Sequence, residues 1–209
     1  MSHKHVYAIP AYGDSPYLES CIKSLKEQKV ASPVIMCTST PSPFLADMAE
    51  KYDLIQMGEQ ALTAKYEASL LTTEQKNTVL TEIAQNLRKE CGSILTANAE
   101  DVREGIQAGM SQGLLDRLKL TEERISQIAE GLVQITKLPD PVGNVLEKFT
   151  RPNGLLISKV SVPMGVIGII YESRPNVTAD AFGLCFKAGN VVILKGGSDA
   201  LHSNIAITN

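Results

Sequence analysis

The sequence lacks the patterns that mark several large classes of protein. It has no stripe of lysine and arginine, and its formal net charge is −3, so we expect no nucleic-acid partner. No apolar run approaches the ~20 residues that span a bilayer. The N-terminus shows neither the apolar core nor the small-residue cleavage site of a secretory signal. We therefore expect a cytoplasmic protein with no membrane partner.

The cysteines lack the spacing of a metal site or of a disulfide framework. The spacing of the four cysteines matches neither CxxC nor a zinc-type pattern, so we expect free thiols and no bound metal. These cysteines are Cys21, Cys37, Cys91 and Cys185. Cys185 falls on a helix that is predicted to be buried, which favours a core thiol over a nucleophile. No residue of the chain is predicted to act as a catalytic nucleophile.

Two common nucleotide-binding signatures are also missing. The chain has neither GxGxxG nor GxxxxGK[ST]. An ordinary Rossmann or P-loop site is therefore excluded.

The chain divides into two unlike parts, residues 1–56 and 57–209. In the first part, β-prone runs at 5–10 and 33–37 alternate with helices predicted from Ser15 and over 43–52. This β-α-β-α order predicts a parallel pair of strands. Two strands make a poor core, so this part is interpreted as the opening of a larger sheet.

The second part begins with about eighty residues of helical pattern. Thr72 and Gln75 fit a capping box for a helix that should end near Cys91. Another helix is expected over 97–108, and Thr121 is expected to cap a third that prolines at 139 and 141 stop.

Strand patterns follow. Runs at 145–150 and 155–161 predict a hairpin, and 164–170 and 191–194 predict buried parallel strands. Between these two strands, Pro175 should open a helix that Gly189 ends. This helix is expected to carry four residues inward, namely Ala181, Leu184, Cys185 and Ala188. Strand, helix and strand make a βαβ unit, so the fold class is α/β.

A glycine turn follows the second buried strand, where ligands bind in open α/β sheets. Gly196 and Gly197 let the backbone approach a ligand, and Ser198 can cap the next helix and leave its amides facing an anion. Lys195 adds a cation at the same place, so we expect this turn to bind a phosphate or ribose of a nucleotide. The alternative is a tight turn beside a solvated lysine.

The loop after the first buried strand gathers Glu172, Arg174, Asn176 and Thr178. Arg174 can grip a carboxylate or phosphate with its planar fork of donors. The alternative is an ion pair between Arg174 and Glu172 or another nearby acid.

Five stretches carry a resemblance to a known family. They are VPMGVIGIIYESRPNVT at 162–178, AGNVVILKGG at 188–197, NAED at 98–101, LDRL at 115–118 and DPVG at 140–143. They resemble segments of γ-glutamyl phosphate reductase and occur along the chain in the same order as in that family, which belongs to the aldehyde dehydrogenase superfamily and has a nucleotide-binding domain that lacks GxGxxG. The resemblance implies an incomplete nucleotide-binding domain of that superfamily over 57–209, with N-terminal helices and a hairpin.

The resemblance also implies an activity and site residues. The family reduces L-glutamate 5-phosphate to the 5-semialdehyde with NADPH in proline biosynthesis. Lys195 would contact the adenosine ribose or its 2′-phosphate, and Gly196, Gly197 and Ser198 the neighbouring phosphate region. Arg174 and Asn176 are assigned to the acyl-phosphate end of the substrate.

Two further expectations follow from the resemblance. The family's cysteine nucleophile aligns beyond Asn209, so the chain is expected to be inactive alone. The 145–161 hairpin resembles part of the superfamily's oligomerisation arm, which implies a homo-oligomer.

Residues 1–56 resemble a different family. YAIPAY at 7–12 and YLESCIKSL at 17–25 are similar to the opening of a type A glycosyltransferase. The metal-binding DxD motif of those enzymes is absent, which argues against transferase activity. The alternative functions are therefore a module that binds sugar nucleotides, or an inactive fusion or truncated product.

Overall fold

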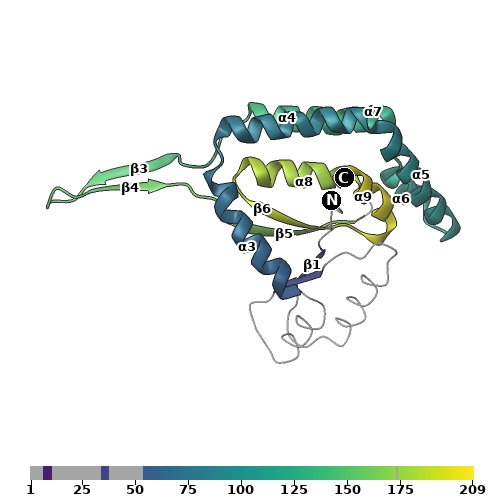
Figure 1. Cartoon of the computed structure of the whole chain (residues 1–209), viewed down its shortest axis with the longest axis horizontal. Coiled ribbons are helices and arrows are strands. Elements are labelled where there is room, and N and C mark those ends of the chain that lie inside the picture. Colours follow the sequence, from purple (N-terminus) through teal and green to yellow (C-terminus); the bar gives the residue numbers. More distant parts are fainter. Residues whose placement is uncertain (1–6, 11–33, 38–53, 173) are drawn as a thin grey trace, which may run out of the picture.

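The structure, a computed structural model, describes residues 7–10, 34–37, 54–172 and 174–209 (Figure 1). The helices predicted from Ser15 and over 43–52 lie outside these residues. The first described helix, α3 (Leu54–Leu70), runs across the domain boundary that was predicted after residue 56. No helix in the described ranges is long and apolar enough to cross a bilayer.

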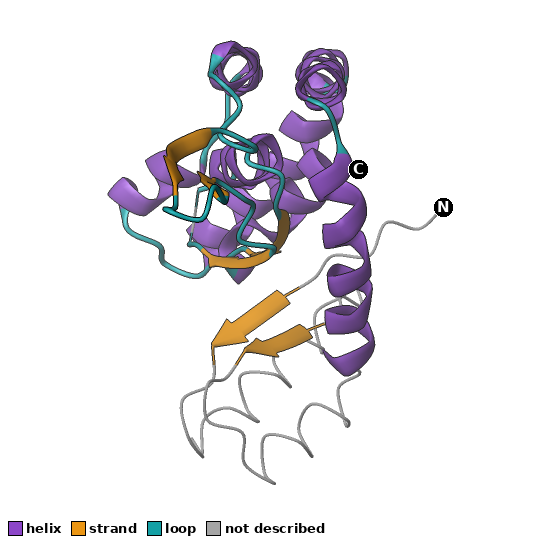
Figure 2. Cartoon of the chain, turned by 90° about the vertical axis from the view of Figure 1, so that its left-hand side faces the viewer, coloured by secondary structure: helices purple, strands orange, loops and turns teal. Residues whose placement is uncertain are grey.

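Two antiparallel helices form the outer layer of the fold, α4 (Thr73–Lys89) and α7 (Glu122–Lys137). Both predicted N-terminal caps are confirmed: Thr72 and Gln75 form the capping box, and the Thr121 hydroxyl accepts a hydrogen bond from the Arg124 amide. Figure 2 shows these two helices end-on above the strands.

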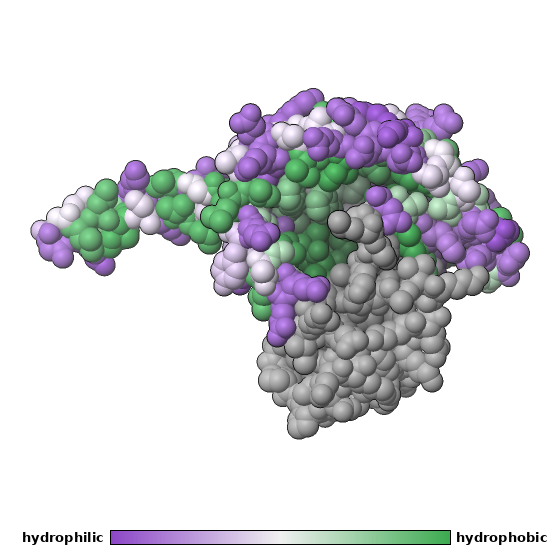
Figure 3. Space-filling model, viewed as in Figure 1, coloured by the Kyte–Doolittle hydropathy of each residue, from purple (hydrophilic) through white to green (hydrophobic). Residues whose placement is uncertain are grey.

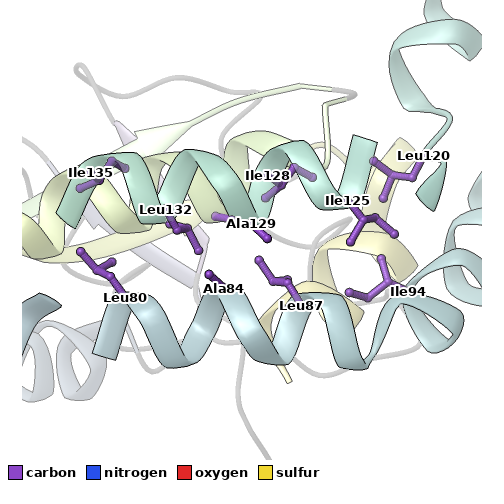
Figure 4. Close-up of a cluster of buried hydrophobic side chains, with 11 residues drawn as sticks. Leu80, Ala84, Leu87, Ile94, Leu120, Ile125, Ile128, Ala129, Leu132 and Ile135 are labelled. Carbon is purple, nitrogen blue, oxygen red and sulfur yellow. The ribbon is translucent and has the colours of Figure 1, made fainter. Parts of the chain in front are cut away.

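The main core lies between α4, α7 and the first turn of α5. Figure 4 shows apolar side chains from the two helices pointing toward one another along their length. Leu80 and Leu132 are fully buried there, and Ile94 and Ile125 are nearly so. Their spacing of three and four residues places them on one face of each helix, which is why the helical pattern could be predicted.

Two helices differ from prediction. α5 (Cys91–Gln107) begins six residues before position 97, because Glu90 ends α4 and also accepts the first hydrogen bond of α5, from the Ile94 amide. Gly92 is therefore inside a helix and does not terminate one. The short helix α6 (Gln112–Leu118) was not predicted.

The predicted βαβ unit is confirmed. β5 (Val166–Ile170) and β6 (Val191–Lys195) pair in parallel, with α8 (Asn176–Lys187) between them in sequence and packed against α7. A 3₁₀ turn (Ser198–Ala200) and α9 (Leu201–Thr208) follow β6.

One predicted inward residue of α8 is wrong. Leu184 is 56% exposed, whereas Ala181 and Cys185 are buried as expected. Gly183 takes the face that meets α7, and a Cβ there would lie 2.6 Å from Leu132. Because α8 approaches α7 this closely, the contact has no room for a large side chain.

The remaining four strands form two separate pairs. β3 (Val145–Thr150) and β4 (Leu156–Val160) form the predicted antiparallel hairpin, which projects as an arm from the body (Figure 1). β1 (Tyr7–Pro10) and β2 (Val34–Cys37) pair in parallel, as predicted, and β1 lies beside β6. Most of the residues that resemble a glycosyltransferase lie outside the described ranges, so that resemblance stays a prediction.

Candidate functional site

The two predicted strand-end loops lie side by side. β5 and β6 are parallel and Ile170 pairs with Lys195, so both strands end at the same edge. Just beyond them, the Tyr171 amide donates a hydrogen bond to the Lys195 carbonyl at 3.0 Å. The loop that leads to Arg174 and the Lys195–Ser198 turn therefore start from adjacent points.

Gly196 lies in close contact with α9 and with Tyr171. A Cβ built there would lie 2.2 Å from Nδ2 of Asn204 in α9 and 3.3 Å from the Tyr171 ring. A side chain at this position would therefore displace the Asn204 amide from its place in the structure. The glycine thus allows α9 to pack directly against the turn.

A chain of hydrogen bonds joins Tyr171, at the start of the first loop, to α8 and α9. The Thr178 hydroxyl donates to Asn204 Oδ1 at 2.9 Å and lies 2.6 Å from the Tyr171 hydroxyl. Because the Thr178 hydroxyl donates its proton to Asn204, the Tyr171 hydroxyl is the donor in its hydrogen bond with Thr178. Thr178 and Asn204 are buried, so this chain fixes Tyr171 relative to α9, the helix that follows the glycine turn.

Asp101, and not Ser198, caps the helix after the glycine turn. Ser198 makes no side-chain capping bond, and its hydroxyl lies 3.5 Å from Asp199 Oδ1. The buried carboxylate of Asp101 in α5 instead accepts from the His202 amide at 3.0 Å and from the Ser203 amide at 2.7 Å. The prediction that Ser198 leaves these amides facing an anion is therefore wrong.

The environment of Asp101 has opposing effects on its charge. Burial raises the pKa of Asp101 above its ordinary value, and this effect outweighs the hydrogen bonds from Ser203 and His202, which lower it. The negative charge is nevertheless well placed at the positive end of a helix.

Asn98, one turn before Asp101, connects the same helix to the corner between α6 and α7. Its amide nitrogen donates to the Leu118 carbonyl at 2.8 Å and to Ser203 Oγ at 2.9 Å, and its oxygen accepts from the Leu120 amide at 2.7 Å. Asn98 and Asp101 stand in one of the stretches that carried the resemblance. Sequence reasoning assigned neither a role, since their partners lie 20 to 105 residues away.

Arg174 and Asn176 line a cavity of about 370 Å³ between α6, α7 and the start of α8. Its other charged lining residues are Asp116, Arg117, Lys119, Arg124 and Asp180. Among the described residues, Arg174 forms no ion pair, so the predicted alternative of a pair with Glu172 is not observed. The cavity therefore gathers four cationic side chains and two carboxylates.

The chain is similar to known proteins over most of its length, although no protein-family model matches it. Over 157 residues the chain is 50% identical to the γ-glutamyl phosphate reductase of Geobacillus thermodenitrificans and 51% identical to that of Halalkalibacterium halodurans. Each alignment covers 75% of this chain and 38% of the relative. The matched part of the chain is homologous to γ-glutamyl phosphate reductase.

Solved structures agree with this homology. The γ-glutamyl phosphate reductase of Thermotoga maritima superposes with a TM-score of 0.72 at 41% identity, covering 73% of this chain and 37% of that one. The Saccharomyces cerevisiae enzyme gives a TM-score of 0.68 at 30% identity over 72% of this chain and 40% of that one. A Bacillus subtilis protein described as a putative aldehyde dehydrogenase, at 18% identity and TM-score 0.60, covers 88% of this chain and 36% of that one. The predicted aldehyde-dehydrogenase-like fold is thereby confirmed, and the chain spans less than half the length of these relatives.

The cysteines of the part homologous to γ-glutamyl phosphate reductase are poor nucleophiles. Burial raises the pKa of the Cys185 thiol, and burial together with the charge of Glu122 raises the pKa of Cys91. Both thiols are free, as predicted. Cys21 lies outside the described residues, as does the side chain of Cys37. The described cysteines thus disfavour the thiolate form that covalent catalysis needs.

Proposed function

We propose that this chain is the cofactor-binding part of a γ-glutamyl phosphate reductase, which holds NADPH at Lys195–Ser198 and L-glutamate 5-phosphate beside Arg174 and Asn176. The observation that supports this most is the hydrogen bond from the Tyr171 amide to the Lys195 carbonyl. It brings the loop assigned to the adenosine end of NADPH and the loop assigned to the substrate to one edge of the sheet, so that both ligands would bind at that edge.

The residues of the glycine turn fit the adenosine end of NADPH. Lys195 forms no ion pair within the described ranges, so its ammonium is available to the 2′-phosphate that distinguishes NADPH from NADH. The Ser198 side chain is exposed beside it. Because Asp101 holds the His202 and Ser203 amides, we assign the contact to Lys195 and Ser198 and not to the start of α9. Bound NADPH would supply the hydride.

The chain is proposed to bind both ligands without completing the reaction. Reduction of an acyl phosphate through a thioester needs a thiolate, and the described cysteines have raised pKa values. We propose that it acts in the cytoplasm, where thiols stay reduced.

A comparison of NADPH with NADH tests the cofactor assignment. Titration followed by nicotinamide fluorescence should show saturable binding, tighter for NADPH. Lys195→Ala should weaken NADPH about tenfold, the effect of losing one charge-assisted hydrogen bond, and should leave NADH nearly unchanged. Lys89→Ala, which removes an exposed lysine at the end of α4, is the control. An absence of saturable binding, or equal loss for both nucleotides in Lys195→Ala, would contradict the proposal.

We further propose that the hairpin pairs with another copy of the chain. Its strands expose large apolar side chains, among them Leu146 at 63% and Leu156 at 60%. Figure 3 shows hydrophobic residues along the projecting arm. Apolar surface of this kind is typical of an interface. Sedimentation velocity should show a dimer or larger species, and the variant Leu146→Asp, Leu156→Asp should shift it toward the monomer. A wild-type chain that sediments as a monomer at micromolar concentration would exclude this role for the hairpin.

A further inference from the structure

The charged side chains of the cavity between α6, α7 and α8 fall into two groups. Arg124 and Asp116 already have partners within the protein. Arg124 Nη2 lies 3.2 Å from Asp116 Oδ1. Arg124 Nη1 donates to the carbonyls of Asp116 at 2.5 Å and Lys119 at 2.6 Å. These bonds hold the corner between α6 and α7. The second group contains the charged residues that take no part in these bonds, namely Arg117, Lys119, Arg174 and Asp180.

None of these four charges is neutralised by a described residue. Arg117, Lys119 and Arg174 form no ion pair with the described part of the chain, although Asp180 lines the same cavity. Asp180 accepts one hydrogen bond, from Asn176 Nδ2 to Oδ2 at 3.1 Å, and has no cationic partner among those residues. The cavity thus holds one carboxylate and three cations that form no ion pair with one another, and it offers two kinds of contact to one ligand.

The position of Asp180 makes a ligand cation favourable there. Asp180 lies on α8 and is half-buried, and burial raises the pKa of its carboxyl group. A partly desolvated carboxylate without a cation is costly, and a bound ammonium would offset that cost. Asn176 fixes the orientation of the carboxylate.

We infer that Asp180, Arg117 and Lys119 determine which ligand this proposed substrate cavity accepts. Asp180, oriented by Asn176, receives the ammonium, while Arg117, Lys119 and Arg174 receive the carboxylate and the phosphoryl group. The inference rests on the proposed function and deepens it, because it adds Asp180, Arg117 and Lys119 as specificity-determining residues.

Charge and size agree with such a ligand. A carboxylate and a phosphate monoester carry about −3 together, since phosphate contributes −1.5 to −2 at neutral pH. The three uncommitted cations match that charge, and Asp180 matches the ammonium. The volume of about 370 Å³ lies within the range of small-molecule sites.

Two stable phosphonates distinguish the contact to the ligand ammonium from the contacts to its anionic groups. 2-Amino-6-phosphonohexanoate carries ammonium, carboxylate and phosphonate at the spacing of an acyl phosphate of glutamate. 6-Phosphonohexanoate lacks only the ammonium. Isothermal titration calorimetry of the wild-type chain should give about tenfold tighter binding of the amino compound, the effect of one charge-assisted hydrogen bond.

Variants then assign the contacts to residues. Asp180→Asn keeps the size of the side chain and should remove most of the difference between the two compounds. Arg117→Gln should weaken both compounds by a similar factor, because each retains its anionic groups. Glu130→Gln, which removes an exposed carboxylate of α7 outside the cavity, is the matched control and should change neither affinity.

The outcomes distinguish this inference from the proposed function. If NADPH binds but the two phosphonates bind equally, or neither binds, the inference is wrong and the cofactor site stands. If the amino compound is preferred while NADPH does not bind, the cavity assignment stands and the reductase proposal fails. Should Asp180→Asn not fold by circular dichroism, the wild-type comparison of the two phosphonates still decides. A folded Asp180→Asn variant that keeps the full difference would also overturn the inference.

Discussion

Asp140→Asn should strongly destabilise the protein, because Asp140 neutralises a buried lysine. Lys76 in α4 is only 1% exposed, and its ammonium lies 2.5 Å from Asp140 Oδ2. The same ammonium donates to the Lys187 carbonyl at 3.2 Å. Asparagine keeps the shape of the aspartate but leaves the Lys76 charge in the interior without a counter-charge.

The expected loss follows from the burial of both partners. The Lys76 side chain is 2% exposed and that of Asp140 is 12% exposed, so solvent screens the pair little. Removing one partner of a buried pair costs about 3–5 kcal/mol. For a chain of this size each kcal/mol lowers the melting temperature by about 2–4 °C, so we expect a decrease of roughly 6–20 °C.

Urea unfolding followed by circular dichroism measures this change. The control is Asp116→Asn, which breaks an ion pair whose aspartate is 71% exposed and should cost less than about 1 kcal/mol. The double variant Lys76→Met, Asp140→Asn removes both charges and should recover part of the loss. If Asp140→Asn and Asp116→Asn changed the free energy of unfolding equally, the argument from buried charge would be refuted.

The pH dependence gives an independent check of the same pair. Burial alone would raise the pKa of Asp140, but hydrogen bonds from Lys76, the Val142 amide and Thr73, together with the Lys76 charge, lower it. A carboxyl group whose pKa is lower in the folded state stabilises the protein above its ordinary pKa of about 4. The difference between wild type and Asp140→Asn should therefore be constant near neutral pH and shrink as the pH falls below about 4 toward the lowered value.

Three further changes have definite expected outcomes. Gly189→Ala should lower the free energy of unfolding by about 1–3 kcal/mol, because φ is +72° and the new Cβ would lie 2.9 Å from Pro163. Gly92→Ala adds a Cβ in open space inside a helix and should raise the free energy of unfolding by up to about 1 kcal/mol. Urea unfolding of the two variants measures both changes. Leu132→Ala should cost about 2–5 kcal/mol in the same assay, because the side chain is fully buried. Asp101→Asn should increase hydrogen exchange of the His202 and Ser203 amides, as measured by mass spectrometry, and unchanged exchange would show that the carboxylate does not hold α9.

The elements that the sequence predicted well are those specified by local signals. The capping box at Thr72, the cap at Thr121 and the positive-φ glycine that ends α8 each depend on residues within four positions. The parallel pairing of β5 with β6 followed from two continuous apolar runs separated by one helix. It brought the two loops of the candidate site to one edge, as predicted.

The differences from prediction have a common cause, which is contact between distant segments. Leu184 is exposed because the close approach of α8 to α7 is made through Gly183. Ser198 does not cap α9 because Asp101, about a hundred residues earlier, already occupies its amides. Residue type and spacing along the chain give no information on which segments meet in space.

Asn98 and Asp101 illustrate how such distant contacts connect the two halves of the candidate site. Asn98 holds the Leu118 carbonyl and the Leu120 amide, on either side of Lys119 in the wall of the charged cavity. Asp101 holds the first turn of the helix that follows the Lys195 turn, and both residues bond to the Ser203 hydroxyl. Both are buried on one face of α5, so a displacement of the cavity wall relative to the glycine turn would break hydrogen bonds that water cannot replace. Besides the hydrogen bonds of Tyr171, α5 therefore stabilises the spacing between the proposed substrate and cofactor sites, although it contributes no residue to the lining of the cavity.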